Sequence, residues 1–321
     1  MLKESDLINR IRAAFSGEGP DLVRGIGDDT AVVCGLHGFT LYTKDLLIED
    51  VHFLRRFHPP RLLGKKSLNV NLSDIAAMGG TPRYALLGLG CPRELETDWL
   101  DDFLGGFREA AVSASVLLIG GDVTRSGPIV VSVTAVGEAE HDVTRGGAQP
   151  GDGLYVSGTL GDSGMGLELL KKGIQPGDDP ACDPLLLAHL DPVPRIALGK
   201  ALGEGSIASA MIDLSDGPAV DLGHMCEESG CGAVIDGSQL PLSDALRRHA
   251  EGDRAVSMAL HGGEDYELLF TIPPDREKKL AVLEGNFSIT RIGRMIEEPG
   301  VFLKDQKGLQ PLTPAGFSHF E

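Results

Sequence analysis

Acidic residues recur in this sequence where apolar segments end beside glycine or another small residue. The set comprises Asp28, Asp29, Asp45, Asp74, Asp122, Asp213, Asp216, Glu264 and Asp265. Strand ends in mixed α/β folds converge on one edge of a sheet, which is where ligands bind. Carboxylates gathered there repel one another unless cations lie between them, and Mg²⁺ takes oxygen ligands and bridges them to phosphate. The pattern therefore predicts a magnesium-dependent phosphotransferase.

Each acidic residue also has a simpler structural interpretation. A single Asp beside Gly is more often part of a turn or a helix cap. Ser73 and Asp74 can be polar positions on a helix, and the segment Asp213–Asp216 can be a helix start capped by Ser215 or Asp216. The number of such sites and their shared placement favour the catalytic interpretation.

Net charge constrains the partners of this chain. The 321 residues carry 47 acidic and 29 basic side chains, a formal charge of −18. Such a surface repels nucleic acid and anionic membranes, so neither is an expected partner. ATP and a second phosphate compound would also be repelled, and several bound Mg²⁺ ions held by the acidic residues would neutralise them.

The cysteines, the apolar runs and the N-terminus indicate the cellular compartment of the protein. The five cysteines, Cys34, Cys91, Cys182, Cys226 and Cys231, are odd in number and scattered. Cys226 and Cys231 have only His224 nearby, so the spacing of a structural zinc site is missing, and free thiols in a reducing cytosol are expected. No apolar run reaches the length of a membrane span, and the N-terminus lacks an apolar signal core. We therefore expect a cytoplasmic protein.

Familiar nucleotide-binding motifs are missing. Gly64-Lys65-Lys66-Ser67 lacks the upstream glycine of a P-loop, and no protein-kinase H-R-D or D-F-G set occurs. The Gly-rich segment 158–166 is on its own a weak signal for phosphate binding. Clustered aspartates, rather than a P-loop, must therefore bring the phosphates together.

Apolar periodicity predicts the elements that position these residues. Helices are expected at 5–15, 61–78, 98–114, 163–172, 194–203 and 218–229, with Ser5 and Thr97 as caps for the first and third. Strands are expected at 30–33, 39–43, 84–89, 116–119, 129–136, 154–157, 208–212 and 266–272. A Gly- and Pro-rich hinge at 144–153 divides the chain. The mixture predicts an α/β or α+β fold with domains at 1–145 and 146–321.

An ordered set of motifs resembles the thiamine-monophosphate kinase family. The motifs are GIGDDTAVV, TKDLLIEDVHF, NLSDIAAMGG, IGGDVTRS, TRGGAQPGD, IDLSDG and GGEDYELLF, with AGFSHF near the C-terminus. They run in order from residue 25 to residue 270, which makes the resemblance specific. The family is part of the superfamily of aminoimidazole-ribonucleotide synthetase, selenophosphate synthetase and the hydrogenase-maturation protein HypE.

The resemblance implies an activity and an assembly. The implied reaction is ATP plus thiamine monophosphate giving ADP and thiamine diphosphate, the final step of thiamine diphosphate biosynthesis. The γ-phosphoryl group would pass directly and in line to the substrate phosphate, with no phospho-enzyme. The implied assembly is a homodimer whose N-terminal domains build a shared barrel, with active sites between the N-terminal and C-terminal domains.

The resemblance also assigns site residues. Magnesium ligands would be Asp28, Asp29, Thr43, Asp45, Asp74, Asp122, Asp213 and Asp216. Nucleotide contacts would be Gly121, Asp122, Arg145 and Ser215, and substrate contacts would be His52, Glu264 and Phe317. Catalysis would depend on Asp45, Asp74, Asp122 and Asp213, acting through the metals.

The sequence departs from the family pattern at two positions. Lys44 stands where a Thr or Ser usually helps to hold a metal, so either a backbone carbonyl is the ligand or that metal site is altered. Asp50 takes a place usually held by Gly and is expected to crowd the substrate loop.

Three alternatives remain open at this stage. Selenophosphate synthetases carry a reactive Cys or selenocysteine in a Gly-rich N-terminal segment, but residues 1–27 contain no Cys. Aminoimidazole-ribonucleotide synthetase and its amidotransferase relative would phosphorylate an amide oxygen, and they lack the NLSDIAAMGG and IDLSDG pairing in this form. An acidic metal-binding module without activity explains the charge, but not His52, Arg145 and Glu264 in their motifs.

Overall fold

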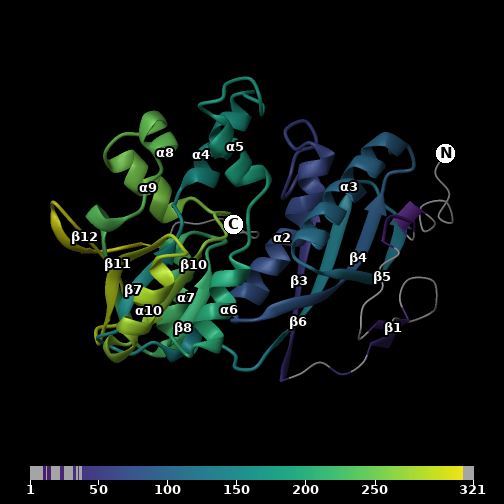
Figure 1. Cartoon of the computed structure of the whole chain (residues 1–321). Helices are drawn as coiled ribbons and strands as arrows, with labels where there is room; N and C mark the ends of the chain where they lie inside the picture. Colours follow the sequence, from purple (N-terminus) through teal and green to yellow (C-terminus); the bar gives the residue numbers. More distant parts are fainter. Residues whose placement is uncertain are drawn as a thin grey trace. The chain divides into compact units, whose positions relative to one another are not determined.

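The computed structural model describes residues 10–11, 13–15, 22–24, 32–33, 35 and 38–313 (Figure 1). The chain divides into two compact units. The first unit comprises Met1–Ile75 and Thr81–Glu140, and the second comprises Ala76–Gly80 and His141–Glu321. Each unit is described by itself below.

The first unit is built on a four-stranded sheet. Its strands are β3 (Phe39–Ile48), β4 (Thr81–Cys91), β5 (Leu117–Arg125) and β6 (Val130–Ala139), in the order β3-β6-β4-β5. Only the β4–β5 pair is parallel. Two short strands, β1 (Leu22–Arg24) and β2 (Val32–Val33), pair separately.

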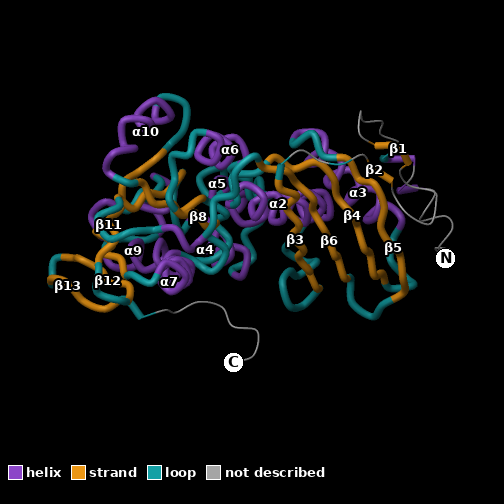
Figure 2. Tube along the Cα trace, turned by 90° about the horizontal axis from the view of Figure 1, so that it is seen from below, coloured by secondary structure: helices purple, strands orange, loops and turns teal. Residues whose placement is uncertain are grey.

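Two helices cover one face of this sheet. They are α2 (Pro60–Ala77) and α3 (Thr97–Ser113), which lie on the same side of the strands in Figure 2. Phe103 and Phe107 on the apolar stripe of α3 are fully buried. A Cβ atom at Gly106 would lie 1.8 Å from the carbonyl oxygen of Arg61, so glycine lets α3 approach α2 closely. Glu96, not Thr97, precedes α3 and no side chain caps it, so the predicted Thr97 cap is wrong.

The other face of the sheet is largely open. Strand residues alternate between the two faces, and along β3 the side chains of Tyr42, Lys44 and Leu46 are exposed while Leu47 is buried. Tyr42 is 74% exposed and Leu46 is 45% exposed, and Leu86 of β4 adds a third apolar side chain at 36%. This open face therefore presents apolar residues at its centre and its β3 edge.

The second unit contains a seven-stranded sheet. Its strands are β7 (Gly153–Ser157), β8 (Ala210–Asp213), β9 (Gly232–Asp236), β10 (Leu268–Ile272), β11 (Ile289–Ile296), β12 (Gly300–Asp305) and β13 (Gly308–Pro311), in the order β13-β12-β9-β11-β7-β10-β8. Its α-helices are α4 (Asp162–Lys171), α5 (Asp183–Leu190), α6 (Ile196–Glu204), α7 (Pro218–Ser229), α8 (Asp244–His249), α9 (Asp253–His261) and α10 (Glu277–Glu284). The 3-10 turns are η1 (Arg145–Gly147), η2 (Gly237–Gln239) and η3 (Pro274–Arg276).

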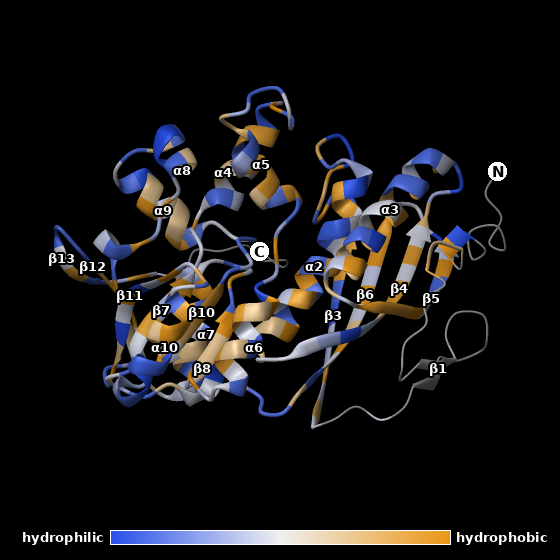
Figure 3. Cartoon of the chain, in the orientation of Figure 1, coloured by the Kyte–Doolittle hydropathy of each residue, from blue (hydrophilic) through white to orange (hydrophobic). Residues whose placement is uncertain are grey.

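Both faces of this larger sheet carry a hydrophobic core. Leu154 and Val156 of β7 belong to one cluster, whereas Tyr155 between them belongs to another. Leu269 and Phe270 of β10 divide between the two clusters in the same way. Strands that are buried on both faces have nearly continuous apolar sequences, and β8 and β10 are mostly hydrophobic in Figure 3.

The predicted fold class is confirmed as mixed α/β, but several element bounds were wrong. Strand β3 runs to Ile48 and β5 runs to Arg125, so Asp45 and Asp122 lie within strands and not after them. The elements α5, β9, β11–β13, α8, α9 and α10 were not predicted. The helix predicted at 5–15 falls mostly outside the described residues. No helix in the described part of the chain is long and apolar enough to cross a membrane.

Candidate functional site

Three of the predicted metal ligands meet between β3 and α2. Thr43 Oγ1 donates a hydrogen bond of 2.5 Å to Asp74 Oδ2. The backbone N–H of Asp45 donates to Asn71 Oδ1 at 3.1 Å, which fixes α2 against this strand. Burial, and then the negative charge of Asp74, raise the pKa of Asp45 to about 6. The fold therefore holds Asp74 close enough for its charge to oppose the ionisation of Asp45.

This donor set suits a hard cation. Two carboxylates and a hydroxyl offer oxygen ligands only, which is the chemistry that Mg²⁺ prefers. A cation between Asp45 and Asp74 would relieve the repulsion that raises the pKa of Asp45. Among the described residues, no group of three or more His, Cys, Asp or Glu side chains is arranged to hold a metal by itself. The residues fit Mg²⁺ in kind, and further oxygen ligands must complete the site.

Asp122 lies on the opposite face of the sheet from Asp45. One cross-strand row consists of Asp45, Val133, Leu87 and Gly121, and the next row consists of Leu46, Ser132, Gly88 and Asp122. Residues directly opposite one another in paired strands share a face. Asp45 therefore lies on the helix-covered face, while Asp122 shares the open face with Leu46. The single chain does not bring Asp122 to the Asp45–Asp74 pair.

Gly121 is required by its position next to Asp122. A Cβ atom there would lie 1.9 Å from the carbonyl oxygen of Leu87, so no other residue fits between β5 and β4 without displacing a strand. Lys44 is exposed and, by the same alternation, lies on the open face, where its row with Thr134 and Leu86 is two rows from that of Asp122. Within one chain, its ammonium group therefore does not stand in for a cation beside Asp45.

The turn after β3 carries His52 and Asp50. The N–H of Ile48 donates to His52 Nδ1 at 3.1 Å, so Nδ1 is an acceptor and the neutral ring carries its proton on Nε2. Asp50 has a φ of 65°, a conformation that glycine adopts without strain. The tight turn explains why glycine would be favoured at this position, and Asp is among the residues that tolerate it best.

In the second unit, the segment between β8 and α7 carries three predicted residues. Asp213 is the last residue of β8 and is buried, and Ser215 and Asp216 follow in the turn. Asp221 Oδ2 accepts the N–H groups of Asp216 at 3.1 Å and Gly217 at 2.9 Å. Sequence reasoning missed Asp221, although an acidic residue in the first turn of a helix that follows Gly-Pro is a recognisable signal. This carboxylate shapes the turn that presents Asp216.

Burial, and then the charges of Asp216 and Asp213, raise the pKa of Asp221 to about 8. Because the folded state holds this proton more tightly than the unfolded chain, stability falls as pH rises from about 4 to about 8. Asp221→Asn keeps an acceptor for both N–H groups and removes the charge. We expect it to stabilise the protein by ~2 kcal/mol at pH 8, with a smaller gain at pH 5.

Urea unfolding of the metal-free protein in EDTA at several pH values measures this difference. Asp253→Asn is the matched control, because the Asp253 side chain is 97% exposed. Parallel pH profiles for wild type and Asp221→Asn would show that Asp221 does not carry the stated proton.

Glu264 and Arg145 are the remaining described site residues of this unit. Glu264 has a φ of 64°, and its N–H donates to the carbonyl of Ser215 at 2.8 Å. This backbone hydrogen bond therefore joins the segment of the predicted substrate contact Glu264 to the segment that carries the predicted metal ligands Asp213 and Asp216. Arg145 begins η1 with an exposed side chain, and its carbonyl accepts from Ser229 Oγ at 2.9 Å. Asp28, Asp29 and Phe317 lie outside the described residues.

The four cysteines within the described part of the chain take no part in this site. Cys91, Cys182, Cys226 and Cys231 are buried free thiols. Cys226 and Cys231 both belong to a core cluster of the second unit, and burial raises the pKa of Cys226 to about 12. Packing among apolar residues accounts for the presence of Cys226 and Cys231.

Comparisons with known proteins place the chain in a family. Residues 27–139 match the AIR synthase related protein N-terminal domain, and residues 149–306 match the C-terminal domain of the same family. Thiamine-monophosphate kinase of Escherichia coli K12 is 41% identical over 99% of this chain and 98% of its own length. The chain belongs to the thiamine-monophosphate kinase family. The resemblance seen in the sequence is thus confirmed, and membership makes the chain a kinase.

Solved structures of thiamine-monophosphate kinases share this fold. The enzyme from Stenotrophomonas maltophilia K279a is 40% identical with a TM-score of 0.85, covering 94% of this chain and 96% of its own. A structure of AaThiL complexed with AMPPCP and TMP is 37% identical with a TM-score of 0.81, covering 100% of this chain and 99% of its own. The thiamine-monophosphate kinase architecture therefore extends over essentially the whole chain.

Proposed function

We propose that this chain transfers the γ-phosphoryl group of ATP to thiamine monophosphate, giving ADP and thiamine diphosphate, the last step in making that cofactor. The observation that carries the proposal is the full-length likeness to AaThiL complexed with AMPPCP and TMP. The paired carboxylates Asp45 and Asp74, with Thr43 beside them, supply the oxygen donors that such a transfer needs. The cytoplasm is the proposed location.

The proposed reaction depends more on the positioning of its two substrates than on a general base. The acceptor is a phosphate oxygen that is already ionised at neutral pH, so in-line transfer without a phospho-enzyme needs two polyanions held in register. Several Mg²⁺ ions, when bound, would supply neutralisation of the phosphate charges. The proposed ligands are Asp28, Asp29, Thr43, Asp45, Asp74, Asp122, Asp213 and Asp216.

The proposed binding roles divide between the two parts of the chain. Residues 1–145 would bind metal and nucleotide and form the dimer, and residues 146–321 would complete the active site. Gly121, Asp122, Arg145 and Ser215 are the proposed nucleotide contacts. His52, Glu264 and Phe317 are the proposed substrate contacts. A guanidinium such as that of Arg145 suits a phosphate, and an aromatic ring such as that of Phe317 suits a cationic thiazolium.

The acceptor test compares two substrates. ADP formation from ATP and Mg²⁺ is followed with thiamine monophosphate and, in parallel, with free thiamine. We expect ADP and thiamine diphosphate with the monophosphate only. Turnover with neither compound, from folded protein that binds ATP, would contradict the proposed substrate and direct attention to other acceptors of the superfamily.

We further propose that the open face of the first sheet is a homodimer interface. Its support is the exposure of Tyr42, Leu46 and Leu86, since apolar side chains gathered on one sheet face mark an interaction surface. The placement of Asp122 on this face gives the interface a role in catalysis. Because β5 is an edge strand of the sheet, Asp122 would lie at the rim of such an interface, and we propose that there it serves the active site of the other copy.

Complementation between inactive variants tests the shared site. Asp45→Asn and Asp122→Asn are each expected to lose activity by about 10²-fold or more, as for other lost electrostatic contacts. A heterodimer of the two variants, made by co-expression with different tags, would contain one site with both aspartates intact. We expect it to regain up to about half of wild-type activity per dimer. An inactive heterodimer would place Asp122 in the site of its own chain, and near-normal turnover by Asp122→Asn alone would remove it from the site.

A further inference from the structure

A buried histidine contacts Glu264 in the second unit. His189 is the penultimate residue of α5, and its side chain is 8% exposed, against 29% for Glu264. His189 Nδ1 lies 3.2 Å from Glu264 Oε2 and 3.1 Å from Ser163 Oγ. The segment Leu-Leu-Ala-His-Leu at 186–190 is typical of an apolar helix with a core histidine, so the sequence alone indicates no role for His189.

Close packing of α4 against α5 holds this histidine in place. A Cβ atom at Gly166 would lie 2.0 Å from the carbonyl oxygen of Leu185 and 3.3 Å from the Cβ of His189. Glycine at this position therefore allows α5 to lie close enough for His189 to reach Ser163 on α4. Because the ring is buried and touches two partners, it has little freedom to turn.

The loop that carries Glu264 is fixed from the other side. Asp265 Oδ2 accepts the N–H of Gly161 at 2.7 Å, and Asp265 Oδ1 accepts the N–H of Ser163 at 3.1 Å. Glu264 and Tyr266, on either side of Asp265, both have positive φ, at 64° and 50°. Non-glycine residues in this conformation persist only where surrounding contacts impose it, and they cluster at functional sites.

The contacts of Nδ1 determine where the proton lies. An ionised Glu264 only accepts hydrogen bonds, so an unprotonated Nδ1 facing Oε2 would be repelled. Nδ1 must therefore carry the ring proton, and this N–H donates a hydrogen bond to Glu264 Oε2, with Ser163 Oγ beside it. This hydrogen bond holds Oε2 of Glu264 and thereby sets the direction in which Oε1 points.

We propose that His189 is a positioning residue that orients the Glu264 carboxylate towards the cationic ring or the amino group of the substrate. The proposal rests on the proposed role of Glu264 as a substrate contact. His189 does not touch the substrate, and its effect passes through Glu264 alone. It therefore governs the affinity for thiamine monophosphate and leaves the affinity for ATP unchanged.

Steady-state kinetics of three variants test this proposal. His189→Leu removes the N–H, and we expect about a tenfold rise in KM for thiamine monophosphate, with kcat and the KM for ATP within about twofold of wild type. His189→Asn places an amide N–H near the position of Nδ1 and should restore most of the loss. His249→Asn is the matched control, since this half-buried histidine of α8 has hydrogen-bond contacts with Ala245 and Cys182, neither of which belongs to the proposed site.

The double variant separates positioning from packing. If His189 acts through Glu264, adding His189→Leu to Glu264→Gln should not raise KM further. Additive effects, or equal changes in the KM values of both substrates, would overturn the proposal. Wild-type protein that does not turn over thiamine monophosphate would instead refute the proposed function, so the two failures are distinct.

Histidine ¹⁵N spectra give a readout independent of turnover and of variant folding. In the wild-type protein, we expect the His189 ring, assigned by its loss in His189→Asn, to show a protonated Nδ1. A ring protonated only on Nε2 would contradict the hydrogen bond to Glu264, whatever the kinetics show.

Discussion

Asp45→Asn is expected to lower kcat by about 10²-fold or more while leaving the fold intact. The loss follows because an amide cannot supply the negative charge that holds a cation against phosphate oxygens. The fold itself should gain stability, since burial and Asp74 raise the pKa of Asp45 to about 6. In the wild-type protein, the free energy of unfolding therefore falls as pH rises from about 4 to about 6. The amide of Asp45→Asn does not ionise and so avoids that loss.

The expected gain for Asp45→Asn in EDTA is about 1 kcal/mol at pH 8, allowing for partial exposure to solvent. Turnover of ATP with thiamine monophosphate and urea unfolding, measured on the same preparation, provide the two values. Asp142→Asn, which changes an exposed carboxylate, is the control. A variant that is less stable than wild type and equally active would contradict both the charge repulsion and the catalytic role.

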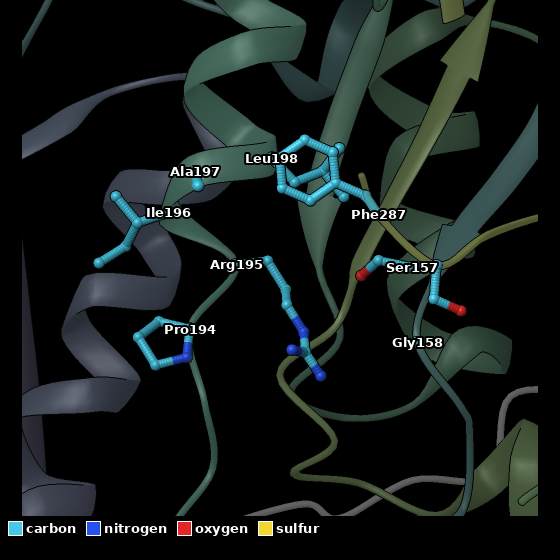
Figure 4. A pocket seen from close by; sticks show the side chains of 9 residues that line it. Ser157, Gly158, Pro194, Arg195, Ile196, Ala197, Leu198 and Phe287 are labelled. Atoms are coloured by element: carbon cyan, nitrogen blue, oxygen red, sulfur yellow. The ribbon is translucent and has the colours of Figure 1, made fainter. Parts of the chain in front are cut away.

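Arg195→Leu is expected to destabilise the protein by about 3–5 kcal/mol, because it leaves a buried carboxylate without its partner. Arg195 Nε donates to Glu267 Oε2 at 2.7 Å, and Nη2 donates to Oε1. Glu267 is only 5% exposed and also accepts from Ser157 Oγ at 2.5 Å. Arg195 lines a cavity of about 250 Å³ with Ser157 and Phe287 (Figure 4), and its side chain is 37% exposed, whereas that of Glu267 is buried.

A second substitution distinguishes the lost charge from lost packing. Glu267→Gln in the Arg195→Leu background removes the unpaired charge and keeps an acceptor for Ser157. We expect the double variant to recover at least half of the lost free energy of unfolding. The midpoint of urea unfolding at pH 7.5 measures this recovery. A double variant less stable than Arg195→Leu would show that the cost lies in the packing of the arginine stem and not in Glu267.

Elements bounded by strong local signals were predictable from the sequence. The helix α2 ends at Ala77, one residue before its predicted end and just ahead of Gly79-Gly80, and α7 begins at Pro218, as predicted, directly after a glycine. Glycine and proline act on the backbone itself, so their effect does not depend on distant parts of the chain.

Strand lengths were not predictable from local composition. Lys44 and Asp45 in β3, and Gly120 and Asp122 in β5, are poor strand formers, and the predicted strands stop before them. In the structure, β3 pairs with β6 from Phe39 to Ile48, and this long-range pairing carries the strand through its polar residues. Long-range strand pairing therefore outweighs local strand propensity at the positions of the candidate ligands Asp45 and Asp122.

The sequence identified most acidic residues of the candidate site, but not their faces or their partners. Whether Asp45 and Asp122 lie on the same side of a sheet depends on the register of β4, β5 and β6, which no local motif encodes. His189 and Glu264 are far apart in the chain and meet only through the packing of α4, α5 and the loop before β10. Family motifs point to chemistry, whereas positioning residues outside the motifs emerge only from the fold.

Transfer of label from ATP to product tests the central claim most directly. The protein is incubated with γ-³²P-labelled ATP, Mg²⁺ and unlabelled thiamine monophosphate, with Asp45→Asn as the inactive control. The account predicts that the label appears in thiamine diphosphate in a 1:1 ratio with ADP and that none stays on the protein. Label released as inorganic phosphate, or retained on the protein with no labelled thiamine diphosphate, would contradict direct phosphorylation of thiamine monophosphate.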